Sequence, residues 1–168
     1  MKHDSYPDVY ILRILDGVRT IAMVGASDLW NRPSFFAMKY LQEKGYRVIP
    51  VNPRLAATGS SVLGEKVCVS IADVPAPVDL VDFYLRSSAV GAVVDEAIAV
   101  APAKGIRVIW MQLGVRDDAA AERAERAGLQ VVMNRCPKIE WGRLHAELSW
   151  SGFNSGVITA KRRRVQAR

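Results

Sequence analysis

Short apolar runs alternate with longer amphipathic stretches along the chain. Short, mainly apolar runs that predict strands occupy residues 20–24, 47–51, 78–84, 107–111 and 130–133. The first of them is continuous, which is typical of a strand buried on both faces of a sheet. Apolar residues at helical spacing occupy residues 8–17, 34–44, 87–104, 117–127 and 138–148. In the first of these, Asp8 is the expected N-cap and Gly17 the expected end. Such regular alternation predicts an α/β fold with a mostly parallel sheet of five or six strands.

The residues that directly follow each predicted strand are the candidates for function. Right-handed crossovers bring the carboxyl ends of parallel strands to one edge of the sheet, and ligands bind there near the topological switch point. Residues 52–77 interrupt the alternation, because Gly59, Gly64, Pro75 and Pro77 favour loop structure. We therefore expect a single domain over residues 1–160, with its site along that edge.

The positive charge of the chain is concentrated at its end. Of the net charge of +6, the segment 161–168 holds five positive and no negative side chains, which leaves +1 for the rest. We expect a solvated, flexible basic tail. The alternative, a nucleic-acid-binding arm, predicts salt-dependent binding that disappears when this tail is removed.

The sequence contains no sign of a membrane or secreted protein. No apolar run approaches the roughly 18 residues that cross a bilayer, and the first eight residues lack the apolar core of a secretory signal. The two cysteines, Cys68 and Cys136, are too few for a disulfide framework. We expect a cytoplasmic protein with reduced thiols.

The loop after the first strand has the composition of a phosphate site. Gly25 directly follows the strand, where a side chain would block a ligand that approaches the backbone. Ser27 supplies a hydroxyl, and Arg32 precedes a helix whose N-terminus favours anions. A dinucleotide fingerprint would require glycine also at positions 27 and 30, where this chain has Ser27 and Trp30. The alternative is a plain strand-to-helix turn that uses glycine for its geometry alone.

The end of the second strand favours a ligand with a phosphorylated ribose. An NAD site usually has a carboxylate there for the ribose hydroxyls, whereas this chain has Asn52-Pro53-Arg54. The Arg54 guanidinium would pair with a phosphate on the ribose, as found in coenzyme A and in NADP. The alternative is a proline-stiffened turn with an exposed arginine.

These motifs together resemble the small bacterial CoA-binding proteins, single-domain relatives of the CoA-binding domain in the α subunit of succinyl-CoA synthetase. The likeness covers roughly residues 10–160 in one order. It is carried by residues 24–27, 32–34, 45–53, 63–64, 78–82, 110–115, 127–129, 132–136 and 152–158. The resemblance implies a Rossmann-like three-layer fold with coenzyme A, or an acyl-CoA, lying across the strand ends.

The resemblance also implies a role for each candidate site residue. The phosphates would meet Gly25, Ala26 and Ser27, with Arg32 or Arg54 supplying charge. The adenosine end would be lined by Val51, Asn52 and Pro53, the middle of the ligand by Phe83 and Tyr84, and the pantetheine arm by Trp110, Gln112 and Gly114. One position departs from the family: Leu85 stands where an arginine is typical, and Arg86 is its possible substitute.

No catalytic constellation stands out in the sequence. His3 and His145 follow no phosphate loop, and no metal-ligand cluster or catalytic triad is present. Cys136 is the one candidate for reactivity, as a partner for a mixed disulfide with CoA, against the simpler interpretation of a small buried residue. We therefore expect a non-catalytic CoA-binding module, acting as a sensor, carrier or regulatory unit. The alternative is an NADP-binding reductase, for which Tyr84 is the one plausible proton donor.

Overall fold

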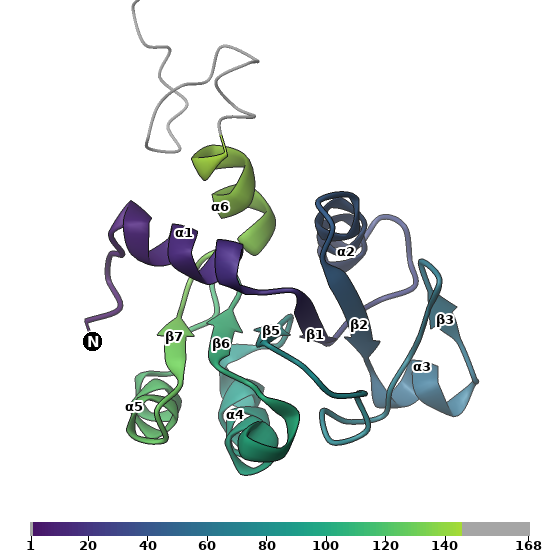
Figure 1. Ribbon diagram of the computed structural model, residues 1–168. Helices are drawn as coiled ribbons and strands as arrows, with labels where there is room; N and C mark the ends of the chain where they lie inside the picture. Colours follow the sequence, from purple (N-terminus) through teal and green to yellow (C-terminus); the bar gives the residue numbers. More distant parts are fainter. Residues whose placement is uncertain (1, 146–168) are drawn as a thin grey trace, which may run out of the picture.

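The computed structural model describes residues 2–145, and Figure 1 shows their helices and strands in space. The elements in chain order are α1 (Asp8–Gly17), β1 (Thr20–Val24), α2 (Pro33–Glu43), β2 (Arg47–Val51), α3 (Pro53–Ala57), β3 (Ser61–Val62), β4 (Glu65–Lys66), β5 (Leu80–Phe83), α4 (Ser87–Lys104), β6 (Val108–Met111), α5 (Asp118–Arg126), β7 (Gln130–Val132) and α6 (Pro137–Leu144). The bounds of α1, β1, β2 and α4 are those that the sequence predicts.

Five strands form one sheet in the order β2-β1-β5-β6-β7, and each neighbouring pair is parallel. The predicted α/β Rossmann-like fold is confirmed, with a sheet of five strands. The chain passes from β1 outward to β2 and then returns to place β5 on the other side of β1. That reversal makes the carboxyl ends of β1 and β5 the topological switch point, where open α/β sheets bind their ligands.

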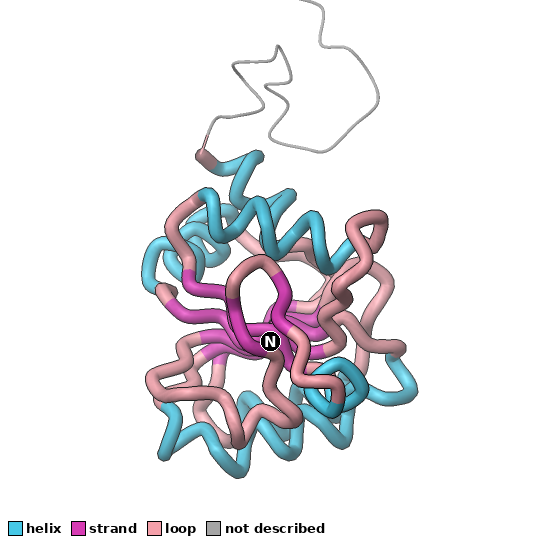
Figure 2. Tube along the Cα trace, turned by 90° about the vertical axis from the view of Figure 1, so that its right-hand side faces the viewer, coloured by secondary structure: helices cyan, strands magenta, loops and turns pink. Residues whose placement is uncertain are grey.

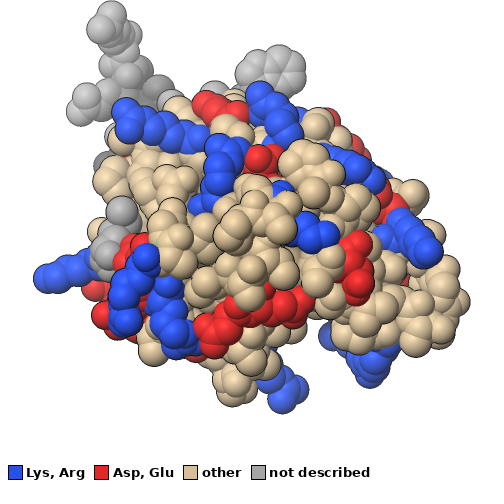
Figure 3. Space-filling model, turned by 60° about the horizontal axis from the view of Figure 1, so that its bottom comes forward, with Lys and Arg blue, Asp and Glu red and all other residues tan. Residues whose placement is uncertain are grey.

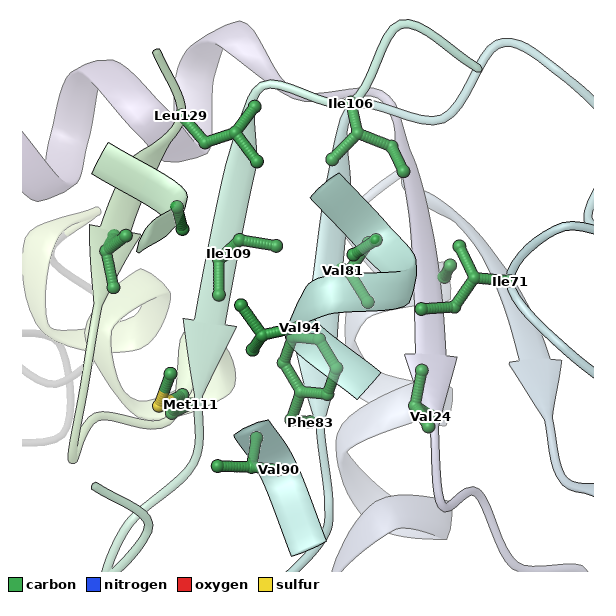
Figure 4. Packing of buried hydrophobic residues seen from close by; sticks show 14 of the residues in the cluster. Val24, Ile71, Val81, Phe83, Val90, Val94, Ile106, Ile109, Met111 and Leu129 are labelled. Carbon is green, nitrogen blue, oxygen red and sulfur yellow. The ribbon is translucent and has the colours of Figure 1, made fainter. Parts of the chain in front are cut away.

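Helices cover both faces of the sheet and give the molecule three layers (Figures 1 and 2). Helices α1, α2 and α6 pack on one face, and α4 and α5 pack on the other. In Figure 4, the strand side chains Val81, Phe83 and Ile109 meet Val90 and Val94 of α4. Because both faces are covered, every residue of β1, β5 and β6 is buried.

The start of α1 differs from the sequence prediction. Pro7, not Asp8, occupies the N-cap position, and Asp8 is the first helical residue. The Asp8 carboxylate instead accepts a hydrogen bond from Arg143 Nη2 of α6 at 2.7 Å. The negative charge of Asp8 in the first turn interacts favourably with the positive end of the helix dipole, so Asp8 stabilises α1 without acting as its N-cap.

The segment expected to be loop contains additional short elements. Asn52 caps α3, and Pro53 occupies its first turn, a combination that favours helix initiation. Strands β3 and β4 form a separate antiparallel pair. Further along, the Cys68 N–H donates to the Pro50 carbonyl oxygen at 2.9 Å, so this segment runs beside the outer edge of β2.

Three predictions fall partly or wholly outside the described residues. The last helix, expected over residues 138–148, is described from Pro137 to Leu144. The end of the single domain expected over 1–160 and the basic tail 161–168 lie beyond residue 145. Within residues 2–145, no helix has the length and apolar character to cross a membrane.

Candidate functional site

Three adjoining pockets follow the carboxyl ends of the strands, and we call them together the groove. The central pocket, of about 490 Å³, lies at the switch point and is lined by Gly25, Ala26, Ser27, Asp28, Leu29, Arg32, Pro33, Ser34, Asn52, Arg54, Leu55 and Tyr84. The β2-side pocket, of about 590 Å³, is lined by Val24, Gly25, Val51, Asn52, Pro53, Arg54, Val69, Ser70, Ile71, Leu85, Val93 and Glu96. The β6-side pocket, of about 740 Å³, is lined by Pro33, Phe36, Ala37, Tyr84, Leu85, Gln112, Leu113, Val115, Cys136, Lys138 and Ile139.

Shared lining residues make the groove continuous. The central pocket shares Gly25, Asn52 and Arg54 with the β2-side pocket. It shares Pro33 and Tyr84 with the β6-side pocket. Leu85 lines both side pockets. One extended ligand can therefore occupy all three pockets with its middle at the switch point.

Gly25 is the residue that allows the first loop to leave β1. Its φ is +81°, in the left-handed region that favours glycine. A Cβ at this position would lie 2.4 Å from the Tyr84 carbonyl oxygen, which belongs to the chain leaving β5. The sequence prediction gave Gly25 the task of clearing space for a ligand. The structure gives Gly25 a second role, because the absence of a Cβ also lets the ends of β1 and β5 lie close together.

The Asn52 side chain joins the loops that follow β1 and β2. Its Nδ2 donates to the Ala26 carbonyl oxygen at 2.8 Å. Its Oδ1 accepts from the N–H groups of Arg54 and Leu55, at 3.0 and 3.4 Å, and so caps α3. Asn52 therefore lines the groove and also fixes the relative position of two of its walls.

The serines of the central pocket order the backbone before α2. Ser27 N–H donates to Ser34 Oγ at 3.1 Å, and Leu29 N–H donates to Ser27 Oγ at 3.2 Å. Ser34 is buried in the first turn of α2. The N-terminus of this 11-residue helix therefore faces the central pocket and contributes the positive end of its dipole.

Two arginines bring positive charge to the central pocket. Arg32 precedes α2 and Arg54 lies in α3, and both side chains are exposed. In the part of the chain that the structure describes, neither guanidinium is held in an ion pair. Asp28 is the acidic residue that lines the same pocket. The two guanidinium groups are thus available to an anion at the switch point.

A buried polar cluster lies behind the β6-side pocket. Gln112 Nε2 donates to both carboxylate oxygens of Asp82, at 2.9 and 3.1 Å. Complete burial raises the pKa of Asp82 to about 7. Burial also raises the pKa of Tyr84, and its hydroxyl has no hydrogen-bond partner among residues 2–145. Burial likewise raises the pKa of the Cys136 thiol, which disfavours a reactive thiolate.

Comparison with known proteins identifies the family of this chain. The family model described as "CoA binding domain" matches residues 19–142, which include the lining residues of all three pockets. The chain belongs to this CoA-binding domain family. Its sequence is 33% identical to the uncharacterized protein YneT of Bacillus subtilis (strain 168) over 130 residues, which are 77% of this chain and 90% of YneT.

Solved structures share the fold of this CoA-binding domain. A hypothetical protein from Pyrococcus horikoshii OT3 has a TM-score of 0.76 and 37% sequence identity, over 84% of this chain and 94% of the other. A dinucleotide-forming acetyl-coenzyme A synthetase 1 from Ca. Korarchaeum cryptofilum has a TM-score of 0.57 and 24% identity, over 68% of this chain and 25% of the synthetase. The second likeness shows the fold alone.

Ten of the thirteen residues predicted for the CoA-binding site line the groove. They are Gly25, Ala26, Ser27, Arg32, Val51, Asn52, Pro53, Arg54, Tyr84 and Gln112. Phe83 and Trp110 are corrections, because both are fully buried. Phe83 packs in the α4 core, and Trp110 Nε1 donates to the Arg135 carbonyl oxygen at 2.8 Å.

Gly114 is exposed but does not line the three pockets, although its neighbours Leu113 and Val115 line the β6-side pocket, so its predicted role at the pantetheine arm stays a prediction. Its N–H donates to Asn134 Oδ1 at 2.8 Å, so this glycine ties the loop after β6 to the loop after β7. The sequence prediction also missed several apolar lining residues of the CoA-binding domain. Phe36, Leu113 and Ile139 line the β6-side pocket, and Val69 and Ile71 line the β2-side pocket. The sequence signal that could have found Leu113 is an apolar residue just past the end of a predicted strand.

Proposed function

We propose that the protein binds coenzyme A along the groove without transforming it, and serves as a sensor, carrier or regulatory module. The order of the three pockets is the observation that carries the proposal. A cationic pocket at the helix N-terminus lies between two mainly apolar pockets. Coenzyme A has the matching order, with phosphates between an adenosine and a long pantetheine arm.

The central pocket suits the phosphates. The N-terminus of α2 and the guanidinium groups of Arg32 and Arg54 supply positive charge from two sides. Arg54 also lines the β2-side pocket, where the ribose and its 3′-phosphate would lie.

The β2-side pocket suits an adenine ring. Val69 is exposed and offers apolar surface to the ring, and Val51 and Ile71 are buried in the wall of the pocket. Glu96 Oε1 accepts a hydrogen bond from the Ile71 N–H at 2.9 Å, which fixes this wall against α4. A preformed apolar slot with a few polar groups is the usual form of a cofactor site.

Several features favour binding over catalysis. A reductase requires a proton donor, and the raised pKa of Tyr84 together with its buried hydroxyl makes this side chain a poor one. His3 is engaged with Tyr6 and Glu125, and His145 stacks on Trp141. Within residues 2–145, no three metal-ligating side chains are grouped together.

The distribution of charge on one face of the protein favours a small anionic ligand over nucleic acid. On the face shown in Figure 3, Lys and Arg side chains are interspersed with Asp and Glu side chains. Binding to nucleic acid usually requires a patch or stripe of one sign. The two arginines of the central pocket are a local concentration that fits a phosphorylated cofactor.

Calorimetric titration with CoA, NADP and NAD in parallel tests this proposal. We expect saturable binding of CoA and a loss of at least about tenfold in affinity for Arg54→Glu, because a charge-assisted contact is replaced by repulsion. Arg13→Glu is the matched control, since Arg13 is exposed on α1 and lies outside the groove. Binding of NADP alone, or of no nucleotide, would overturn the proposal.

A further inference from the structure

The β6-side pocket is larger and more apolar than a pantetheine arm requires. Its volume of about 740 Å³ exceeds that of the central pocket, at about 490 Å³. Most of its wall comes from apolar side chains of α2, of the loop after β6 and of α6. A pantetheine arm is a chain with two polar amide groups and a thiol, so it does not account for such a surface.

Two polar lining residues of this pocket have their polar atoms engaged or buried. The Gln112 amide donates to Asp82, as described above, and the Tyr84 hydroxyl is buried. Lys138 also lines the pocket, and its Nζ lies 5.6 Å from the centre of the Tyr40 ring, in a cation–π arrangement. The exposed surface of the pocket is therefore mainly apolar.

Large apolar side chains remain in water at this pocket. Phe36 is 47% exposed and Leu113 is 56% exposed, and both line it. Leu29 and Val69, two others of the six large exposed apolar side chains among the described residues, line the remaining pockets of the groove. Exposed apolar groups gathered at one site mark a surface that a ligand covers.

We propose that the β6-side pocket holds the acyl group of an acyl-CoA, and that this group is an uncharged aliphatic chain. The inference rests on the proposed function, because the nucleotide must lie in the other two pockets for the thioester end to reach this one. The pocket shares Pro33 and Tyr84 with the central pocket, so a CoA with its phosphates at α2 extends into it directly.

The surroundings of the pocket set a limit to the length of the chain. Beyond Leu113 and Ile139 lies a further hollow of about 480 Å³, whose lining combines apolar residues with the charged residues Asp8, Arg135, Glu140 and Arg143. There Arg143 pairs with Asp8 and with Glu140, each at 2.7 Å. Methylene groups that reach these ion pairs gain no apolar contact. The preferred acyl group is therefore short to medium in length.

The test compares CoA with acetyl-, butyryl- and hexanoyl-CoA, and with a six-carbon acyl-CoA that ends in a carboxylate. We expect the affinity to rise about twofold to fourfold for each added methylene, the upper value corresponding to about 0.8 kcal/mol for a buried CH₂. The carboxylate-ended ligand should lose this gain, because an apolar wall does not solvate its charge. Equal affinities across the series, or tighter binding of the carboxylate-ended ligand, would overturn the inference.

Two variants and one control connect the gain to this pocket. Phe36→Ser and Leu113→Ser should lower the affinity for hexanoyl-CoA more than the affinity for CoA, and so flatten the dependence on chain length. Val9→Ser is the matched control, because Val9 is 55% exposed on α1 and lines none of the pockets. If the affinity of Phe36→Ser and Leu113→Ser depends on acyl chain length as it does in the unmodified protein, the inference is refuted.

The same titrations separate failure of the inference from failure of the proposed function. If CoA binds and the acyl chain adds nothing, the CoA site stands and the acyl pocket is refuted. If neither CoA nor any acyl-CoA binds, the proposed function itself fails.

Discussion

Replacement of Gly25 by alanine tests how closely the ends of β1 and β5 approach. An L-residue at a φ of +81° costs roughly 1–2 kcal/mol. The new Cβ would also lie 2.4 Å from the Tyr84 carbonyl oxygen. That oxygen cannot retreat freely, because the Tyr84 N–H donates to Val24 at 2.9 Å. Overpacking of this kind adds about 1–3 kcal/mol, so the total loss of unfolding free energy should be roughly 2–5 kcal/mol.

Gly105→Ala is the matched control for this substitution. Gly105 has a φ of +80°, and a Cβ there would meet nothing within 4 Å. Its loss should therefore be the backbone cost alone, roughly 1–2 kcal/mol. In thermal denaturation, each kcal/mol corresponds to about 2–4 °C for a chain of this size, so Gly25→Ala should melt roughly 2–12 °C below Gly105→Ala. It should also weaken CoA binding, while Gly105→Ala should not. Equal melting temperatures would refute the steric argument.

Three further predictions concern the buried polar groups behind the groove. Tyr84→Phe should raise the unfolding free energy of the free protein by about 1 kcal/mol, because it removes a buried hydroxyl without a partner; a loss of stability in urea denaturation would contradict this. Asp82 has its pKa raised to about 7 from 3.8, so the folded state holds its proton longer than the unfolded state and stability falls as the pH rises between these values. Asp82→Asn should therefore stabilise the protein more at pH 8 than at pH 5, and an equal gain at both would refute the assignment. Cys68 should be alkylated before the more buried Cys136, and oxidation with CoA should give no adduct at Cys136 in peptide mass spectra.

The fold could be predicted because each strand of the five-stranded sheet is a mainly apolar run. A strand buried on both faces has no polar alternation, so residues 20–24 and 47–51 stand out from their neighbours. The same property explains the wrong assignment of Phe83 and Trp110 to the site. Helices cover both faces of the sheet, so Phe83 and Trp110 in its central strands are fully buried, and residues that follow these strands, such as Tyr84 and Gln112, line the groove instead.

The loops gave a less complete prediction for a different physical reason. The motif at Gly25 and the cap at Asn52 are local features, and the sequence displays them directly. The walls of the side pockets come from segments that are distant in the chain, such as Val69 beside Val51, and Phe36 opposite Leu113. Which of these residues meet depends on the path that long connecting segments take over the edge of the sheet. The spacing of hydrophobic residues does not predict that path.

Both outer strands of the sheet have part of their free edge hydrogen-bonded to other segments, which bears on how copies of this protein can associate. Along β2, Pro50 has no N–H to donate, its carbonyl oxygen accepts from Cys68, and Cys68 in turn accepts from the Asn52 N–H. Along β7, the Tyr10 hydroxyl donates to the Val131 carbonyl oxygen. Just past the strand, the Tyr6 hydroxyl accepts from the Met133 N–H. A free strand edge is the usual template for fibrous aggregation and for strand-exchanged dimers. Extension of the sheet by a second copy would have to break these contacts first, which favours assembly through the helices or the groove.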